Sequence, residues 1–170
     1  KDIQTRFEKI CQESSKKNIK VLVDAEESWI QSAIDELVLQ MMKKYNSKNA
    51  VVFNTIQAYR RDRFEYLKQL HQSNSGQFKI GVKLVRGAYM EKERKRALRY
   101  NYSSPICDNK EQTDQIFNNS LEFIISNIDD FELFIGSHNE DSNRLSTKLL
   151  KKYMIENSDE RVWFSQLYGM

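Results

Sequence analysis

Two charged side chains stand where an apolar strand would be expected to carry none. Lys83 interrupts the run GVKLV, and Asp24 directly follows the run VLV. An unpaired lysine in the protein interior loses several kcal/mol of hydration energy, so it must be paired, exposed at a strand end or used in chemistry. Asp24 supplies the opposite charge if the two strands lie close together. We therefore predict that Lys83 forms an ion pair with Asp24 beside a bound ligand.

The alternation of side chains along the strand of Lys83 indicates which neighbouring residues lie on the same face of the sheet as the lysine. If Val82 and Leu84 face the covering helices, then Gly81, Lys83 and Val85 face the opposite side. The small Gly81 is expected to leave room beside the lysine for a flat ligand.

Other polar side chains gather where the predicted strands end. Taken singly, each has an ordinary explanation; Glu26 and Glu27, for example, could be first-turn acids that complement a helix dipole. Two segments, RGAY and GSHN, place backbone amides at the start of a helix, an arrangement that favours phosphate groups. The polar strand ends are formed by Glu26, Glu27, Asn54, Gln57, Arg86, Tyr89, Ser137, His138, Asn139, Ser165 and Gln166.

Apolar runs of strand length alternate with amphipathic stretches of helix length along the chain. Strands are predicted at about 20–25, 50–57, 79–86, 131–137 and 161–167, and helices at about 3–17, 29–45, 60–73, 90–101, 110–127 and 141–156. Ser28 and Gln31 have the spacing of a capping box at the start of the second helix. A loop and an extra helix lengthen the connection between the third and fourth strands.

This alternation predicts a parallel sheet covered by helices, either doubly wound or closed as a (β/α)8 barrel. A barrel needs about 250 residues, whereas a doubly wound domain of 170 residues could be whole. The last predicted strand is followed by no covering helix. We therefore predict an α/β fold: an incomplete (β/α)8 TIM-like barrel of about five strands, with residues 1–170 as part of a single barrel domain truncated at both ends.

Such a sheet has two unpaired edges. The interior face around residues 21–23 and 162–164 should be open to water, because five strands cannot close an eight-stranded barrel. We expect these 170 residues alone to be prone to aggregation.

The composition excludes several classes of protein. The chain has 27 basic and 24 acidic residues, interleaved through most of its length, which gives no case for nucleic-acid binding. The densest basic stretch, 90–100, is interpreted as a solvated helix face, since Glu91 with Lys95 and Glu93 with Arg96 have helical salt-bridge spacing. No apolar run approaches the roughly 18 to 20 residues of a membrane span, so any membrane contact would be peripheral.

The two cysteines, Cys11 and Cys107, match neither a metal spacing nor a disulfide framework. They are interpreted as packing residues in a reducing compartment, and no metal site is predicted. The opening residues have the pattern of an amphipathic helix without the character of a targeting peptide.

Five segments, in chain order, resemble strand-end motifs of the proline dehydrogenase family, and most closely its eukaryotic mitochondrial form: VDAEES, NTIQAYRRD, KLVRGAYMEKER, GSHNED and SQLYGM. The resemblance implies a distorted (β/α)8 barrel that holds FAD at the carboxyl ends of its strands. It also implies oxidation of L-proline to 1-pyrroline-5-carboxylate, the first step of proline catabolism, with electrons passed to a membrane quinone. The implied location is the matrix side of the inner mitochondrial membrane.

The resemblance also implies roles for individual residues. Asp24 corresponds to an active-site acid near substrate and flavin, and Ala25 lies beside the isoalloxazine. Gln57 is expected to hydrogen-bond the polar edge of the flavin. Lys83, the second catalytic residue implied, takes the place where many bacterial members have an arginine near flavin N5, so the charge is kept but a bidentate contact is not.

The remaining roles belong to the third and fourth strand ends. Arg86, Gly87 and Ala88 are expected to hold the phosphates and ribose of FAD, with Ala88 also near the substrate. Tyr89 is expected to line the proline pocket, and Ser137 and His138 to contact the dinucleotide portion.

Two motifs of the family do not occur in this sequence: the paired arginines that bind the substrate carboxylate and a lysine on an early strand. The stretch is therefore expected to be inactive by itself. Two other functions remain open from the residues, a Schiff-base aldolase or lyase that uses Lys83 as the nucleophile, and a non-catalytic remnant of a barrel. The sequence does not distinguish proline from hydroxyproline as the substrate.

Overall fold

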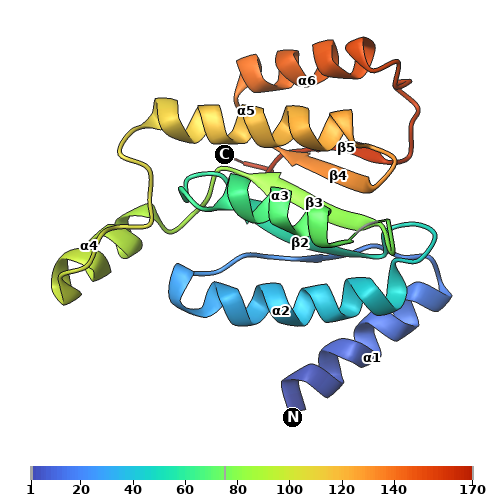
Figure 1. Cartoon of the computed structure of the whole chain (residues 1–170), viewed down its shortest axis with the longest axis horizontal. Helices are drawn as coiled ribbons and strands as arrows, with labels where there is room; N and C mark the ends of the chain where they lie inside the picture. The colour runs from blue at the N-terminus through green and yellow to red at the C-terminus, as the bar shows by residue number, and fades with distance from the viewer. Residues whose placement is uncertain (1, 75, 170) are drawn as a thin grey trace.

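The structure, a computed structural model, describes residues 2–74 and 76–169. Helices and strands alternate as the sequence predicts, and most bounds lie within a few residues of the predicted ones (Figure 1). The elements are α1 (Asp2–Lys16), β1 (Val21–Val23), α2 (Ser28–Tyr45), β2 (Val52–Gln57), α3 (Arg63–Asn74), β3 (Ile80–Val85), α4 (Met90–Tyr100), α5 (Lys110–Ser126), β4 (Phe131–Gly136), α6 (Glu140–Lys152) and β5 (Val162–Ser165).

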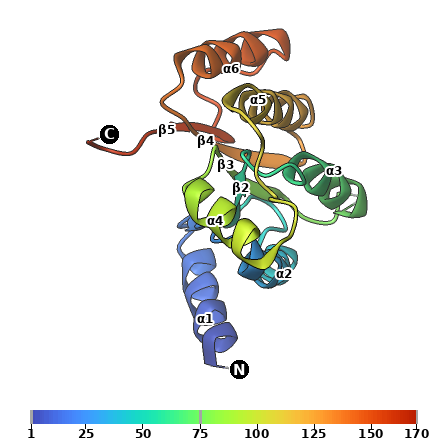
Figure 2. The ribbon, with the colours of Figure 1, turned by 90° about the vertical axis from the view of Figure 1, so that its left-hand side faces the viewer.

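The five strands form one sheet in the order β1-β2-β3-β4-β5, and every neighbouring pair is parallel. A doubly wound sheet reverses its strand order at a switch point, whereas a barrel adds each strand beside the previous one. The order therefore confirms an incomplete (β/α)8-type barrel. Figure 2 shows helices α2, α3, α5 and α6 arranged in an arc around the strands.

The two faces of β3 differ in burial as the alternation predicts. Val82 and Leu84 are buried, whereas Lys83 and Val85 are half-buried on the opposite face. The helix-facing side chains form the apolar core of the molecule, which is continuous from α2 across to α6. Strands β1 and β5 lack fully buried residues, because each has a sheet neighbour on one side only.

Helix α4 is the element that interrupts the regular alternation. It follows β3 directly and lies in front of the strand ends in the view of Figure 2. The predicted pairing of Glu91 with Lys95 is present at 3.7 Å. The predicted pairing of Glu93 with Arg96 is wrong: Glu93 is fully buried and bonds to Ser28, while the Arg96 guanidinium lies over the Trp29 ring.

The predicted capping box at the start of α2 is also wrong. The N-cap residue is Glu27, and Ser28 is already the first helical residue. Gln31 reaches back as expected, but its side-chain oxygen accepts from the backbone N–H of Glu26 at 2.8 Å. In a capping box the serine hydroxyl accepts from a backbone N–H at the start of the helix. Here the acceptor at the start of α2 is the Glu93 carboxylate. Its negative charge suits the positive end of the α2 dipole better than a hydroxyl does.

Both cysteines are free and buried, which agrees with their interpretation as packing residues. Within residues 2–74 and 76–169, no helix has the length and apolar character to cross a membrane.

Candidate functional site at the carboxyl ends of the strands

An ion pair joins Lys83 of β3 to Asp24, which follows β1. The Lys83 Nζ lies 2.5 Å from the Asp24 Oδ1, so the predicted pairing is confirmed. The register places Lys83 beside Thr55 of β2, whose hydroxyl donates to the carbonyl of Val23 at 2.7 Å. The pair thus spans β2, on the face of the sheet turned away from the helices. The Asp24 side chain remains 76% exposed, so the pair borders open space.

The amide of Gln57 lies at the end of β2, between the segments that follow β1 and β3. Its Nε2 donates to the carbonyl of Glu26 at 2.9 Å, and its Oε1 accepts from the backbone N–H of Ala88 at 3.4 Å. Gln57 and Ala25 are both buried. Because the amide is bonded on both sides, its orientation is defined by the protein.

Arg86 is fixed by side chains of α5, α6 and the segment after β4. Its Nε lies 2.8 Å from the Asp114 carboxylate of α5, and its other two nitrogens donate to the hydroxyls of Ser137 at 2.8 Å and Ser142 at 2.9 Å. The guanidinium also lies 4.4 Å from the Phe117 ring centre. Burial raises the pKa of the Asp114 carboxyl, but the bonds to Lys110 and Arg86 outweigh burial and hold that pKa below its usual range.

Ser137 and His138 follow β4. The buried Ser137 hydroxyl accepts from Arg86 and from the backbone N–H of Asn139. The exposed His138 ring accepts from the backbone N–H of Leu167 at 3.2 Å. A hollow of about 260 Å³ beside them is lined by Ser137, Ser165, Gln166, Phe164, Ile135 and Asn143.

Gly87 and Tyr59 meet where β3 leads into α4. Gly87 has a φ of +127°, and a Cβ on it would lie 2.5 Å from the Tyr59 ring. Tyr59 is buried, and burial, with the nearby charge of Glu93, raises the pKa of its phenol to about 12. The Tyr89 phenol lies beside the Glu26 carboxylate, whose interaction with it is the main cause that raises the pKa of Tyr89.

We expect Gly87→Ala to destabilise the protein by about 3 kcal/mol, because the new methyl group meets both an unfavourable φ and an immobile ring. Gly76→Ala is the matched control: Gly76 also has a positive φ, of +73°, but no atom of the described residues lies within 4 Å of its added Cβ. Its cost should be about 1 kcal/mol. Urea unfolding measures both. Equal losses would show that Tyr59 does not restrict position 87.

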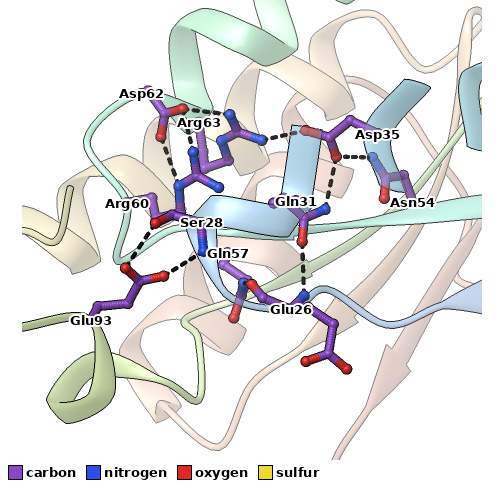
Figure 3. Close-up of polar contacts among 10 residues, drawn as sticks. All are labelled: Glu26, Ser28, Gln31, Asp35, Asn54, Gln57, Arg60, Asp62, Arg63 and Glu93. Atoms are coloured by element: carbon purple, nitrogen blue, oxygen red, sulfur yellow. Dashed lines mark hydrogen bonds and ion pairs between the residues drawn. The ribbon is translucent and has the colours of Figure 1, made fainter. Parts of the chain in front are cut away.

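A buried polar network supports the segment after β1 (Figure 3). The Asp35 carboxylate of α2 accepts from Gln31 and Asn54, each at 2.8 Å, and pairs with Arg63 at 2.7 Å. Gln31 in turn accepts from the backbone of Glu26. Burial lowers the pKa of Arg63, but Asp62 and Asp35 outweigh it and hold that pKa above its usual range.

The expectation that Gly81 leaves room for a flat ligand is wrong. A Cβ at this position would lie 2.4 Å from the carbonyl oxygen of Val52 and 2.8 Å from the Phe53 ring. The neighbouring strand and its phenylalanine already fill the space, so glycine is needed here for close packing of β2 and β3.

A larger hollow, of about 790 Å³, lies at the amino ends of the strands. Its central contact is the ion pair of Lys20 with the buried Glu132 at 2.7 Å, with the Lys20 Nζ 4.3 Å from the Trp163 ring centre. Barrel enzymes carry their catalytic residues at the opposite, carboxyl ends of the strands. Residues at the amino ends contribute to stability instead. We therefore place the site at the carboxyl ends despite the smaller hollow there.

Sequence reasoning missed the partners that hold the site residues in place. Asp114, Ser142 and Glu93 lie on helices, where each resembles an ordinary helix-surface residue. Only the fold distinguishes them, because it buries Ser142 and Glu93 and places the half-buried Asp114 against Arg86. The one signal in the sequence was the position of Glu93: a carboxylate on the buried side of a helix needs a hydrogen-bond or ion-pair partner.

The arrangement combines a cation beside a carboxylate, an oriented amide, and backbone amides at two helix starts. These groups suit a ligand with a negatively charged or electron-accepting ring and phosphate groups. Among residues 2–74 and 76–169, no three His, Cys, Asp or Glu side chains are grouped to hold a metal ion.

Comparison with known proteins identifies the family of this chain. The family model described as proline dehydrogenase matches residues 2–170. "Proline dehydrogenase 1, mitochondrial" of Dictyostelium discoideum is 37% identical over all of this chain and 31% of its own length. The human protein of the same name is 30% identical over 97% of this chain and 28% of its own length.

A solved structure shares the fold. Proline utilization A from Bdellovibrio bacteriovorus, inactivated by N-propargylglycine, matches with a TM-score of 0.90 and 24% identity, over 98% of this chain and 17% of its own. The chain spans 31% and 28% of the length of the two mitochondrial relatives. Since the family model covers nearly every residue, the chain belongs to the proline dehydrogenase family.

Proposed function

We propose that this chain forms the cofactor-binding wall of an enzyme that oxidises L-proline to 1-pyrroline-5-carboxylate with FAD and passes the electrons to a quinone. The observation that carries the proposal is the Lys83–Asp24 ion pair, set at the strand ends of a chain that matches the family throughout. The relatives are named as mitochondrial, and we propose the same compartment, on the matrix side of the inner membrane, with at most peripheral membrane contact.

The donors present suit FAD. Lys83 offers a cation on the open face, Gln57 offers a fixed amide, and the exposed Gly87 and Ala88 offer backbone without bulky side chains. Arg86 uses one of the two hydrogens on its Nη1 for Ser137. With Ser137 and His138 beside the small hollow, these residues would hold the phosphates and the dinucleotide portion.

FAD, when bound, supplies the acceptor for the hydride of proline. The protein's own part is positioning and charge balance. Lys83 places a positive charge where negative charge develops during the reaction, and Asp24 keeps its ammonium group in place. Gln57, held by Glu26 and Ala88, would orient the flavin edge. Ala88 and Tyr89 would line the proline pocket, with the Tyr89 phenol held by Glu26.

A Schiff-base lyase fits the geometry less well. A lysine that forms a Schiff base must react as the free amine, whereas Lys83 serves as the counter-charge of Asp24.

The test is a visible absorption spectrum of the protein at its full natural length. We expect flavin bands that bleach when proline is added under anaerobic conditions and recover with a quinone. A folded, colourless protein that gains no flavin from added FAD would overturn the proposal. Trapping of a carbonyl substrate on Lys83 by borohydride would favour the lyase instead.

A further inference from the structure

Four side-chain contacts join residues 24–28, which lead from β1 into α2, to residues 83–93, which lead from β3 into α4. They pair Asp24 with Lys83, Glu26 with Tyr89, Glu27 with Lys92, and Ser28 with Glu93. We call these four pairs the cross-loop contacts. They run in order along both segments and pass over the end of β2, where Gln57 bonds to both sides.

The contact between Glu93 and Ser28 differs from the other three in burial. Glu93 is fully buried. The Asp24 side chain is 76% exposed, and the Glu27 carboxylate, although buried itself, pairs with a Lys92 side chain that is 63% exposed. Exposed ion pairs contribute roughly 0 to 1 kcal/mol, because water and salt screen them. The exposed contacts therefore do not by themselves fix the distance between the two segments.

Glu93 caps α2 from a different helix. Its two carboxylate oxygens accept from the Ser28 backbone N–H at 2.5 Å and the Ser28 hydroxyl at 2.8 Å, as Figure 3 shows. The negative charge lies at the positive end of the α2 dipole, and both bonds are charge-assisted. If α4 moved away from α2, a buried carboxylate would lose its donors, which is costly. The cap therefore resists separation of the two segments.

The spacing connects this cap to the proposed site. Asp24 precedes Ser28 by four positions, and Tyr89 precedes Glu93 by four positions. A shift of α4 relative to α2 would move Tyr89, at the start of α4, away from Glu26, just before the start of α2.

We propose that Glu93 is a positioning residue: by capping α2 from α4, it sets the separation of the two walls that carry Asp24 and Tyr89. The proposal rests on the proposed function for its effect on turnover. Its structural part, the tie between the two helices, can be tested without any cofactor.

The experiment uses Glu93→Met and Glu93→Gln in the protein at its full natural length. Methionine keeps the volume of the side chain but removes both acceptors, whereas glutamine can still accept from the Ser28 N–H and donate to its hydroxyl. We expect Glu93→Met to raise the KM for proline about tenfold with a smaller change in kcat, because the pocket walls are displaced. Glu93→Gln should stay within about threefold of the parent.

The control is a substitution that lowers stability without touching the cap. Leu149→Ala removes a buried side chain of α6, which contributes none of the four contacts. It should lower the thermal midpoint but leave the KM for proline unchanged. An equal rise in KM in Leu149→Ala and Glu93→Met would overturn the proposal, because general destabilisation would then explain both.

Hydrogen exchange in the flavin-free protein gives the second readout. We expect the amide of Ser28 to exchange at least about tenfold faster in Glu93→Met, and near the parent rate in Glu93→Gln and Leu149→Ala. Unchanged exchange in Glu93→Met refutes the cap. If the parent protein binds no flavin, the proposed function fails, but the exchange result still shows whether Glu93 caps α2.

A second variant is used if Glu93→Met does not fold. Ser28→Ala keeps the backbone hydrogen bond to Glu93 and loses the hydroxyl bond, so it should raise the KM for proline about two- to threefold. An unchanged KM would refute the proposal.

Discussion

Asp35→Ala should lower the free energy of unfolding by about 3 kcal/mol, since it removes one partner of a buried ion pair. Asp35 and Arg63 are both more than nine-tenths buried, and their charged atoms are 2.7 Å apart. Without the carboxylate, the guanidinium keeps the half-exposed Asp62 as an ion-pair partner and the Tyr66 ring beside it, and the amides of Gln31 and Asn54 lose their acceptor. Urea unfolding of the protein at its full natural length measures the loss.

The chain offers a matched control in a second aspartate–arginine pair. Asp129 and Arg161 are 2.8 Å apart, but the Asp129 side chain is 96% exposed. Asp129→Ala should therefore cost less than about 1 kcal/mol. The double substitution Asp35→Leu with Arg63→Met should recover much of the loss, because no buried charge is left unpaired. Similar losses for Asp35→Ala and Asp129→Ala would contradict the importance we assign to burial.

Lys83→Met should slow flavin reduction by proline about tenfold or more, while the protein still folds. The substitution removes the positive charge next to the proposed flavin position and leaves the Asp24 carboxylate without its partner at 2.5 Å. Stopped-flow absorbance of the flavin measures the rate, and the thermal midpoint reports folding.

Two further substitutions make this result specific. Lys83→Arg keeps the positive charge and introduces the arginine that the family resemblance implies for many members at this position, so we expect it to be tolerated. Lys95→Met removes an exposed lysine of α4, whose side chain is 82% exposed, and should leave the rate unchanged. If Lys83→Met kept its full flavin content and its reduction kinetics were unaltered, Lys83 would not be part of the catalytic site.

The pairing of Lys83 with Asp24 could be predicted because each residue breaks a local rule. A lysine inside an apolar run needs a partner, and a parallel sheet brings the strand ends together. The alternation of strands and helices predicts a parallel sheet but allows a doubly wound sheet as well as a barrel. The family resemblance favours the barrel, and the observed strand order confirms it.

The cap of α2 and the packing at Gly81 could not be predicted in the same way. Glu93 is 65 residues from Ser28, and its spacing to Arg96 suggested an ordinary surface pair. The acidic residue that caps the start of a helix can come from another helix, and which residue does so depends on how the two helices pack. No local sequence pattern predicts that packing. Gly81 was interpreted as free space because the sequence does not show which side chain of the next strand lies against it; the structure places Phe53 there.

The agreement between strand order and chain order has a consequence for synthesis on the ribosome. Each strand pairs with the one made just before it, so its partner is already present when it emerges. A unit of roughly 30 residues takes seconds to make at about 5–20 residues per second, far longer than a helix or a local contact needs to form. The ion pair of Lys20 with Glu132 bridges 112 positions and can form only after β4 has begun to emerge. The sheet can therefore grow strand by strand from its amino end, at the pace of translation.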